Sequence, residues 1–117
     1  MRRIFADTFY WLALANARDQ WHEEAKRLSA NLGGVSLITI EEVLIEFLTW
    51  FAHRGPTGRA HAVDTVRRIL GDAGTYVVPQ THEGFLMALE LYSQRLDKRY
   101  SMTDCISMQA MRSLGVT

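Results

Sequence analysis

Short apolar runs alternate with longer helical stretches along this chain. The apolar runs cover 4–6, 35–38 and 76–78, and each of them predicts a buried strand. The segments between and after these runs predict helices over 8–17, 19–32, 39–53, 57–70, 81–96 and 103–114. Strands that alternate with helices predict a parallel sheet covered on both faces. The expected fold class is therefore α/β, a three-layer α/β/α sandwich formed by a single domain over 1–117.

Polar residues stand where several of these helices are expected to begin. Asp7, Asp19 and Thr39 are candidate N-caps, because their side chains can accept hydrogen bonds from the free N–H groups of a first helical turn. The helix that follows Thr39 carries an apolar stripe, which predicts its buried face. The stripe consists of Val43, Leu44, Phe47, Leu48 and Phe51, with Trp50 at its edge.

Composition and charge narrow the classes of protein to which the chain can belong. Hydrophobic residues make up 48% of the 117 residues and charged residues 22%, as in ordinary globular domains. The 13 basic and 13 acidic residues cancel, which argues against a strongly basic nucleic-acid binder. A lone cysteine, Cys105, can form neither an internal disulfide nor a zinc site. We expect a cytoplasmic protein, and no apolar run is long enough to span a membrane.

Three carboxylates are the candidates for chemistry. Asp7 follows the first strand, Glu46 lies just beyond the apolar stripe, and Asp104 opens the last helix. Each has a structural alternative: Asp7 as an N-cap, Glu46 as a solvated side chain, and Asp104 as the partner of Ser101 in a capping box. Carboxylates that converge from separate elements need a cation between them. Oxygen ligands select Mg²⁺ or Mn²⁺, and such sites hydrolyse phosphodiesters.

Other catalytic motifs are missing from the sequence. The four histidines are scattered and show no HExxH or HxxxH spacing, which argues against a zinc hydrolase. No glycine-rich phosphate-binding loop of the kind that holds ATP or NAD occurs either. A metal-dependent phosphatase is disfavoured because the segment after Asp7 lacks the second acid of that pattern.

The order of the acidic segments resembles a known family. Phe5-Ala6-Asp7-Thr8 comes first, Leu37-Ile38-Thr39 and Val43-Leu44-Ile45-Glu46 follow, and Ser101-Met102-Thr103-Asp104-Cys105 is the most specific segment. Together they resemble the PIN domain, and within it the VapC-type toxins of toxin–antitoxin pairs. The resemblance covers nearly the whole chain and implies a ribonuclease that depends on Mg²⁺ or Mn²⁺.

The resemblance also implies roles for individual residues. Asp7, Glu46 and Asp104 match the metal-binding and catalytic acids, with Asp97 as an auxiliary acid and Glu42 as the alternative to Glu46. Thr8 and Thr103 would orient these carboxylates. Positive charge has to flank a negative pocket that RNA approaches, and the candidate phosphate contacts are Arg2, Arg3, Arg95, Lys98 and Arg99, against the alternative of a solvated run of charges. Phe9, Tyr10, Trp11 and Tyr100 are candidates for stacking on bases, against the alternative that they pack in the core.

The resemblance implies two protein partners: a second copy in a homodimer and a small antitoxin. The large apolar side chains of Trp11, Leu12, Leu14, Phe47, Trp50 and Phe51 exceed what one small core needs, so we expect part of this set to form an interface. Family members usually carry a fourth acid after a further strand, and this sequence ends where that strand would begin. The alternative function is therefore a C-terminally truncated, catalytically impaired module that binds RNA or protein.

Overall fold

Three parallel strands form the centre of the fold. In the computed structural model, which describes residues 2–116, β1 (Arg2–Phe5), β2 (Val35–Ile40) and β3 (Thr75–Val78) lie in the order β1-β2-β3. The register pairs Ile4 with Leu37 and Ile38 with Tyr76, so β2 is hydrogen-bonded on both edges. Parallel strands end at the same edge of a sheet, and the segments that follow β1 and β2 therefore emerge side by side.

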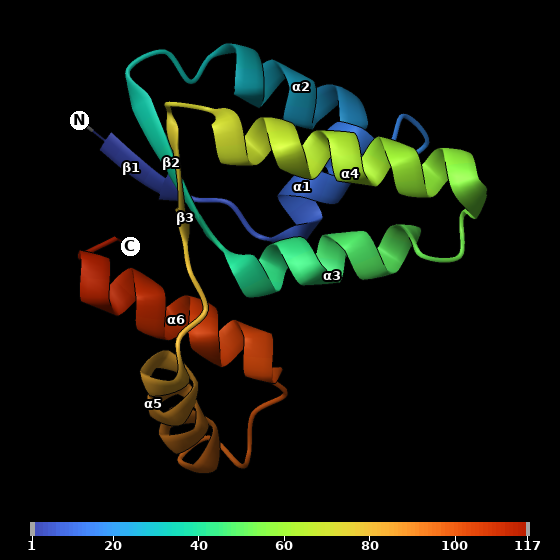
Figure 1. The fold of residues 1–117 in the computed structure, drawn as a ribbon. Coiled ribbons are helices and arrows are strands. Elements are labelled where there is room, and N and C mark those ends of the chain that lie inside the picture. Colours follow the sequence, from blue (N-terminus) through green and yellow to red (C-terminus); the bar gives the residue numbers. More distant parts are fainter. Residues whose placement is uncertain (1, 117) are drawn as a thin grey trace.

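Helices cover both faces of this sheet. Within residues 2–116 they are α1 (Thr8–Ala15), α2 (His22–Ala30), α3 (Glu41–Phe51), α4 (Gly55–Gly71), α5 (His82–Ser93) and α6 (Met102–Leu114). The first four lie to one side of the strands and α6 to the other, with α5 beyond it (Figure 1). Right-handed crossovers between neighbouring strands explain why α1 to α4 share a face. The predicted α/β/α sandwich is confirmed.

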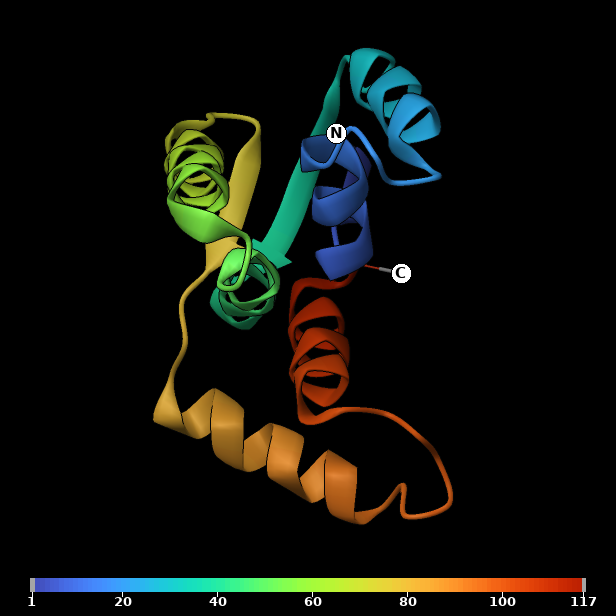
Figure 2. The same cartoon turned by 90° about the vertical axis from the view of Figure 1, so that its right-hand side faces the viewer.

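The main core forms around α3. Val43, Leu44, Phe47 and Phe51 are buried, which confirms the stripe read from the sequence. Trp11 from α1 and the residues Ala62 and Ile69 from α4 are buried in the same cluster. α5 packs mainly against α6 around the fully buried Cys105, and Figure 2 shows it set away from the strands.

The large apolar residues for which the sequence predicts a partial interface pack within or against the core, and the interface itself stays a prediction. Trp11, Phe47 and Phe51 are buried, and Leu12, Leu14 and Trp50 pack partly buried against the same cluster. The physical reason is that α1 and α4 both pack on α3, so three helices and the sheet share these side chains. The large apolar residues that stay exposed lie elsewhere, and α5 carries more of them than any other element of the described chain.

Two predicted N-caps are wrong. Thr39 lies inside β2, because the pairing with β3 continues to Ile40, and α3 begins after Ile40 without a side-chain cap. The hydroxyl of Thr39 is fully buried; it donates to the Ala6 carbonyl at 2.8 Å and accepts from Trp11 Nε1 at 3.3 Å. Asp19 accepts from the Trp21 N–H at 2.8 Å, which closes a turn ahead of α2.

Two helices end earlier than the sequence predicts. α1 ends at Ala15 rather than at residue 17, and α5 ends at Ser93 rather than at residue 96. Along the described chain, 2–116, we find no helix with the length and apolar character needed to cross a bilayer.

Candidate active site

Asp7 lies where β1 passes directly into α1. The Ala6 N–H still donates to the Ile38 carbonyl at 2.8 Å, so the sheet pairing extends to the residue before Asp7. Asp7 is the N-cap of α1, and its Oδ1 accepts from the Tyr10 N–H at 3.0 Å. The predicted cap is therefore present, and it holds one carboxylate oxygen at the carboxyl edge of the sheet. Its Oδ2 has no hydrogen-bond partner among residues 2–116.

Glu46 comes from α3, which begins immediately after β2. Its Oε1 accepts a hydrogen bond from the Thr8 hydroxyl at 2.7 Å, which connects the start of α1 to the middle of α3. Glu42, one turn earlier, is partly buried and lines a different hollow together with Ile40, Tyr76 and residues of α5 and α6. Of the two candidate acids on this helix, Glu46 is therefore the one that lies beside the other carboxylates.

Asp104 lies in the first turn of α6, where a capping box forms. Its Oδ2 accepts from the Ser101 N–H at 2.9 Å, and its own N–H donates to Ser101 Oγ at 3.0 Å. The structural alternative for Asp104 is thus realised, and the residue is exposed rather than turned inward. A capping box uses only one of the two carboxylate oxygens, so Oδ1 is left without a hydrogen-bond partner within residues 2–116.

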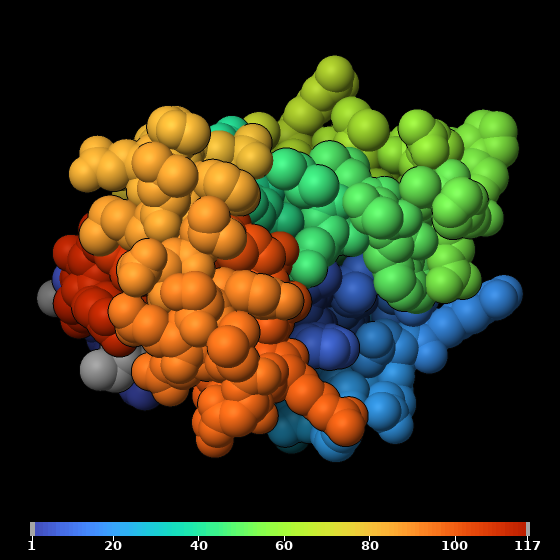
Figure 3. All heavy atoms as spheres, turned by 90° about the horizontal axis from the view of Figure 1, so that it is seen from below, coloured from blue at the N-terminus to red at the C-terminus, as the bar shows by residue number. Residues whose placement is uncertain are grey.

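Two adjoining hollows collect the three carboxylates. One, of about 350 Å³, is lined by Asp7 and Asp104 beside Tyr100, and the other, of about 510 Å³, by Glu46 and Asp104 beside Thr8. Asp104 therefore lies on the boundary between them. In Figure 3, blue atoms of the α1 region lie between the green of α3 and the orange segment that leads into α6.

The three carboxylates surround the hollows without meeting at one point. Among residues 2–116, no three side chains of Asp, Glu, His or Cys are close enough to hold a single ion. Each carboxylate nevertheless offers one oxygen held by the protein and one oxygen that accepts no hydrogen bond from the residues the structure describes. An oxygen-only donor set of this kind suits hard cations such as Mg²⁺ and Mn²⁺.

The remaining candidates lie further out. Asp97 belongs to the loop before α6, where its carboxylate is 4.0 Å from Lys98 Nζ, and neither residue lines the two hollows. Arg99 is exposed in the same loop, and Thr103 is partly buried in the first turn of α6. Sequence reasoning missed Arg54, whose guanidinium carbon lies 3.7 Å from the ring centroid of Trp50 at the larger hollow. The i, i+4 spacing of this pair was the signal that could have found it.

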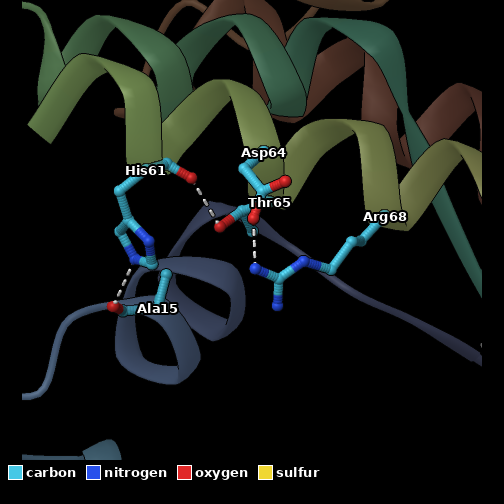
Figure 4. A network of polar contacts seen from close by, with 5 residues as sticks. All are labelled: Ala15, His61, Asp64, Thr65 and Arg68. Carbon is cyan, nitrogen blue, oxygen red and sulfur yellow. Dashed lines mark hydrogen bonds and ion pairs between the residues drawn. The ribbon is translucent and has the colours of Figure 1, made fainter. Parts of the chain in front are cut away.

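A separate hollow of about 470 Å³ lies between α1 and α4, on the face of the sheet that α1 to α4 cover. Figure 4 shows the polar contacts along its rim, where His61 Nε2 donates to the Ala15 carbonyl at 3.0 Å and Arg68 pairs with Asp64. Tyr10 also lines this hollow, and its buried hydroxyl has no hydrogen-bond partner within the described range 2–116.

Comparisons with known proteins identify the family of this chain. No family model matches the chain. The chain is 33% identical over 113 residues to the 23S rRNA-specific endonuclease VapC20 of Mycobacterium tuberculosis (strain CDC 1551 / Oshkosh). This alignment covers 97% of this chain and 83% of that protein. The crystal structure of M. tuberculosis VapC20, described as a sarcin–ricin loop cleaving toxin, matches with a TM-score of 0.83 at 31% identity, over 96% of this chain and 83% of that one. The chain belongs to the VapC family of PIN-domain toxin ribonucleases.

Membership in the VapC family decides between the two functions left open by the sequence. The relative is an endonuclease, and it matches this chain over 97% of its length in sequence and 96% in fold. The ribonuclease toxin is therefore confirmed, and the module without catalysis is not favoured. The hollows lined by Asp7, Glu46 and Asp104 are the candidate active site of this VapC protein.

Proposed function

We propose that this VapC protein is an endoribonuclease that depends on Mg²⁺ or Mn²⁺ and holds the metal with Asp7, Glu46 and Asp104. The observation that carries the proposal is the hydrogen bonding of the three carboxylates. They come from three separate elements, and each has one oxygen held by the protein and one without a hydrogen-bond partner in the described part of the chain. Asp97, in the loop that leads to α6, is the proposed auxiliary acid.

The protein's own groups prepare the carboxylates for this role. The Tyr10 N–H fixes the orientation of Asp7, the Thr8 hydroxyl that of Glu46, and the capping box that of Asp104. Because like charges repel, the carboxylates gain by moving closer only when a cation lies between them. Glu46 is exposed on its helix, so its side chain can turn without repacking the core. A bound Mg²⁺ or Mn²⁺ would supply the Lewis acidity that hydrolysis of a phosphodiester requires.

The proposed substrate is the sarcin–ricin loop of 23S rRNA, and the proposed location is the cytoplasm, where ribosomes work. The proposal rests on the relative, which is described as cleaving that RNA. Lys98 and Arg99 are exposed in the loop that leads to Asp104, where they can contact phosphates that approach the acidic hollows. Positive charge is needed there because the carboxylates repel the RNA backbone.

The proposed protein partner is a small antitoxin that binds in the hollow between α1 and α4. This hollow is separate from the acidic hollows, and its lining combines apolar residues with polar ones. The buried Tyr10 hydroxyl lacks an acceptor within residues 2–116, and a carbonyl group of an inserted peptide would provide one. Replacement of Tyr10 by Phe should then weaken antitoxin binding, measured by calorimetry, and leave RNA cleavage unchanged.

A homodimer is the second proposed assembly. α5 exposes a series of large apolar side chains that soluble monomers rarely leave uncovered. Phe85, Leu86, Leu89 and Tyr92 lie on one side of the helix, whereas the exposed Met87 contacts Gln109 of α6. We propose that a second copy covers this face. Light scattering should give the mass of a dimer for the native chain and that of a monomer after Leu86→Glu.

The decisive experiment tests cleavage and metal dependence together. The native protein is incubated with 23S rRNA in Mg²⁺, in Mn²⁺ and in EDTA, beside Asp104→Asn prepared in the same way. Asn keeps a carbonyl oxygen that can accept from the Ser101 N–H, so the capping box and the fold persist while the charge is lost. We expect cleavage with either metal and a loss of at least about 100-fold in EDTA and in Asp104→Asn. Equal cleavage by the variant would refute the assignment of the site.

A binding measurement separates a missing metal site from a missing substrate. Millimolar Mn²⁺ should raise the melting temperature of the native protein and not that of Asp7→Asn, because an ion that binds only the folded state stabilises it. A metal shift without cleavage would show that the RNA was the wrong one. If Mn²⁺ changes the melting temperature of neither protein, the metal site is refuted.

A further inference from the structure

Phe9 is an exposed aromatic residue beside the candidate active site. It lies in the first turn of α1, two residues after Asp7, and 81% of its surface is accessible. Its neighbours Tyr10 and Trp11 pack against the core or lie within it. The fold therefore gains little from the Phe9 ring, and an aromatic ring held in water costs hydrophobic free energy. Such a ring points to a contact made outside the folded chain.

The ring lines the hollow that contains two of the carboxylates. Phe9 and Glu46 are both lining residues of this hollow of about 510 Å³, and so is Asp104. Trp50, from α3, contributes a second aromatic ring, and Arg54 lies over that ring at 3.7 Å from its centroid. The volume is within the range of about 300–1,000 Å³ that is typical of small-molecule sites. The hollow therefore has room for a planar group beside an aromatic ring.

The charge of the hollow favours a base over a phosphate as the group that enters it. Glu46 and Asp104 repel phosphates at short range, whereas stacking of a base on an aromatic ring does not depend on the charge of the backbone. We propose that Phe9 stacks on the base of the nucleotide next to the scissile phosphate and that the Trp50–Arg54 pair forms the opposite wall. This inference rests on the proposed ribonuclease function and assigns the part of the RNA that the larger hollow recognises.

A protein partner is the competing explanation for the exposed ring. Phe9 also lines a neighbouring hollow with Trp21 and Leu28, which are themselves exposed. That hollow is not lined by Glu46, by Asp104 or by Trp50. Trp21 thus provides a matched control, because it is an exposed aromatic residue next to Phe9 but outside the hollow that holds the carboxylates.

The first test compares variants of Phe9 in RNA cleavage. Stacking on an aromatic ring predicts that Phe9→Ala lowers kcat/KM by roughly 10- to 100-fold. Phe9→Trp should restore activity, whereas Phe9→Leu, which is apolar but has no π face, should stay low. Trp21→Ala should cleave like the native protein. Melting temperatures of all four variants should match the native value, because both side chains are largely exposed.

The second test identifies the group that Phe9 contacts. The substrate is a hairpin RNA with the sarcin–ricin loop sequence, in which an abasic residue replaces one or the other nucleotide that flanks the mapped cleavage position. If Phe9 stacks on one of these bases, Phe9→Ala and that abasic substitution should each reduce cleavage, and together they should reduce it no further. Losses that multiply at both positions would show that Phe9 acts elsewhere and would overturn the inference.

The outcomes separate this inference from the proposed function. Native protein that cleaves no RNA refutes the function itself. Native protein that cleaves, with Phe9→Ala equally active, leaves the function intact and refutes the stacking. Phe9→Ala that cleaves normally but no longer binds the antitoxin would assign the ring to the protein partner instead.

Discussion

The buried hydroxyl of Thr39 offers the sharpest test of how the fold supports the candidate site. Thr39 is fully buried in β2, where it donates to the Ala6 carbonyl and accepts from Trp11 Nε1. The Ala6 carbonyl immediately precedes Asp7, so this one hydroxyl fastens the end of β1 and the start of α1 to the central strand. Thr39→Val keeps the shape of the side chain and removes both hydrogen bonds.

The expected cost follows from the two groups that lose their partner. A buried polar group left unsatisfied costs about 1–3 kcal/mol. The contact with Trp11 is long, at 3.3 Å, so we take the lower half of that range for the pair, about 2–4 kcal/mol in total. For a domain of 117 residues this corresponds to a fall in Tm of roughly 6–20 °C. Such a loss would be large beside the total stability of a small domain, about 5–15 kcal/mol.

The assay is urea unfolding of Thr39→Val followed by circular dichroism, with Thr49→Val as the matched control. Thr49 is exposed, and its hydroxyl donates to the Ile45 carbonyl within the same helix, so its loss should change stability by less than about 0.5 kcal/mol. Thr39→Ser retains the hydroxyl and should recover part of the stability. If Thr39→Val is no less stable than Thr49→Val, the reasoning is refuted.

Three further changes test other parts of the structure. Thr8→Val should change the free energy of unfolding by less than about 0.5 kcal/mol, because the hydrogen bond from Thr8 to Glu46 is exposed. The same variant should lower RNA cleavage by about 10- to 100-fold in a steady-state assay. Unchanged cleavage would show that Thr8 does not orient the acid. Phe47→Ala should cost about 3–5 kcal/mol in urea unfolding, since the ring is completely buried beside Phe51, and a loss below 1 kcal/mol would contradict this packing. Ser101→Ala should lower stability by about 1 kcal/mol in the same assay, because half of the capping box is lost; an unchanged midpoint would argue against the box.

Local patterns along the sequence were sufficient for the elements and for the class of fold. The strands, the helices and the buried stripe of α3 follow from the spacing of apolar residues, which depends on neighbours within a few positions. The N-cap role of Asp7 and the capping box of Ser101 and Asp104 are local in the same sense, since each joins residues three positions apart. The order of the acidic segments was also enough to indicate the family.

Tertiary structure alone decided which residues meet. Thr39 is of a residue type that often caps helices, yet it lies inside a strand because β3, more than 30 residues away, continues to pair with it. Glu46 rather than Glu42 lines a hollow with Asp104, and Thr8, 38 residues earlier, donates to it, because folding packs α1 against α3. Trp11 and Phe51 are large aromatic residues that pack in the core, whereas Phe9, which is also aromatic, stays exposed. Contacts of this kind depend on distant segments brought together by folding, and no local pattern of the sequence carries that information.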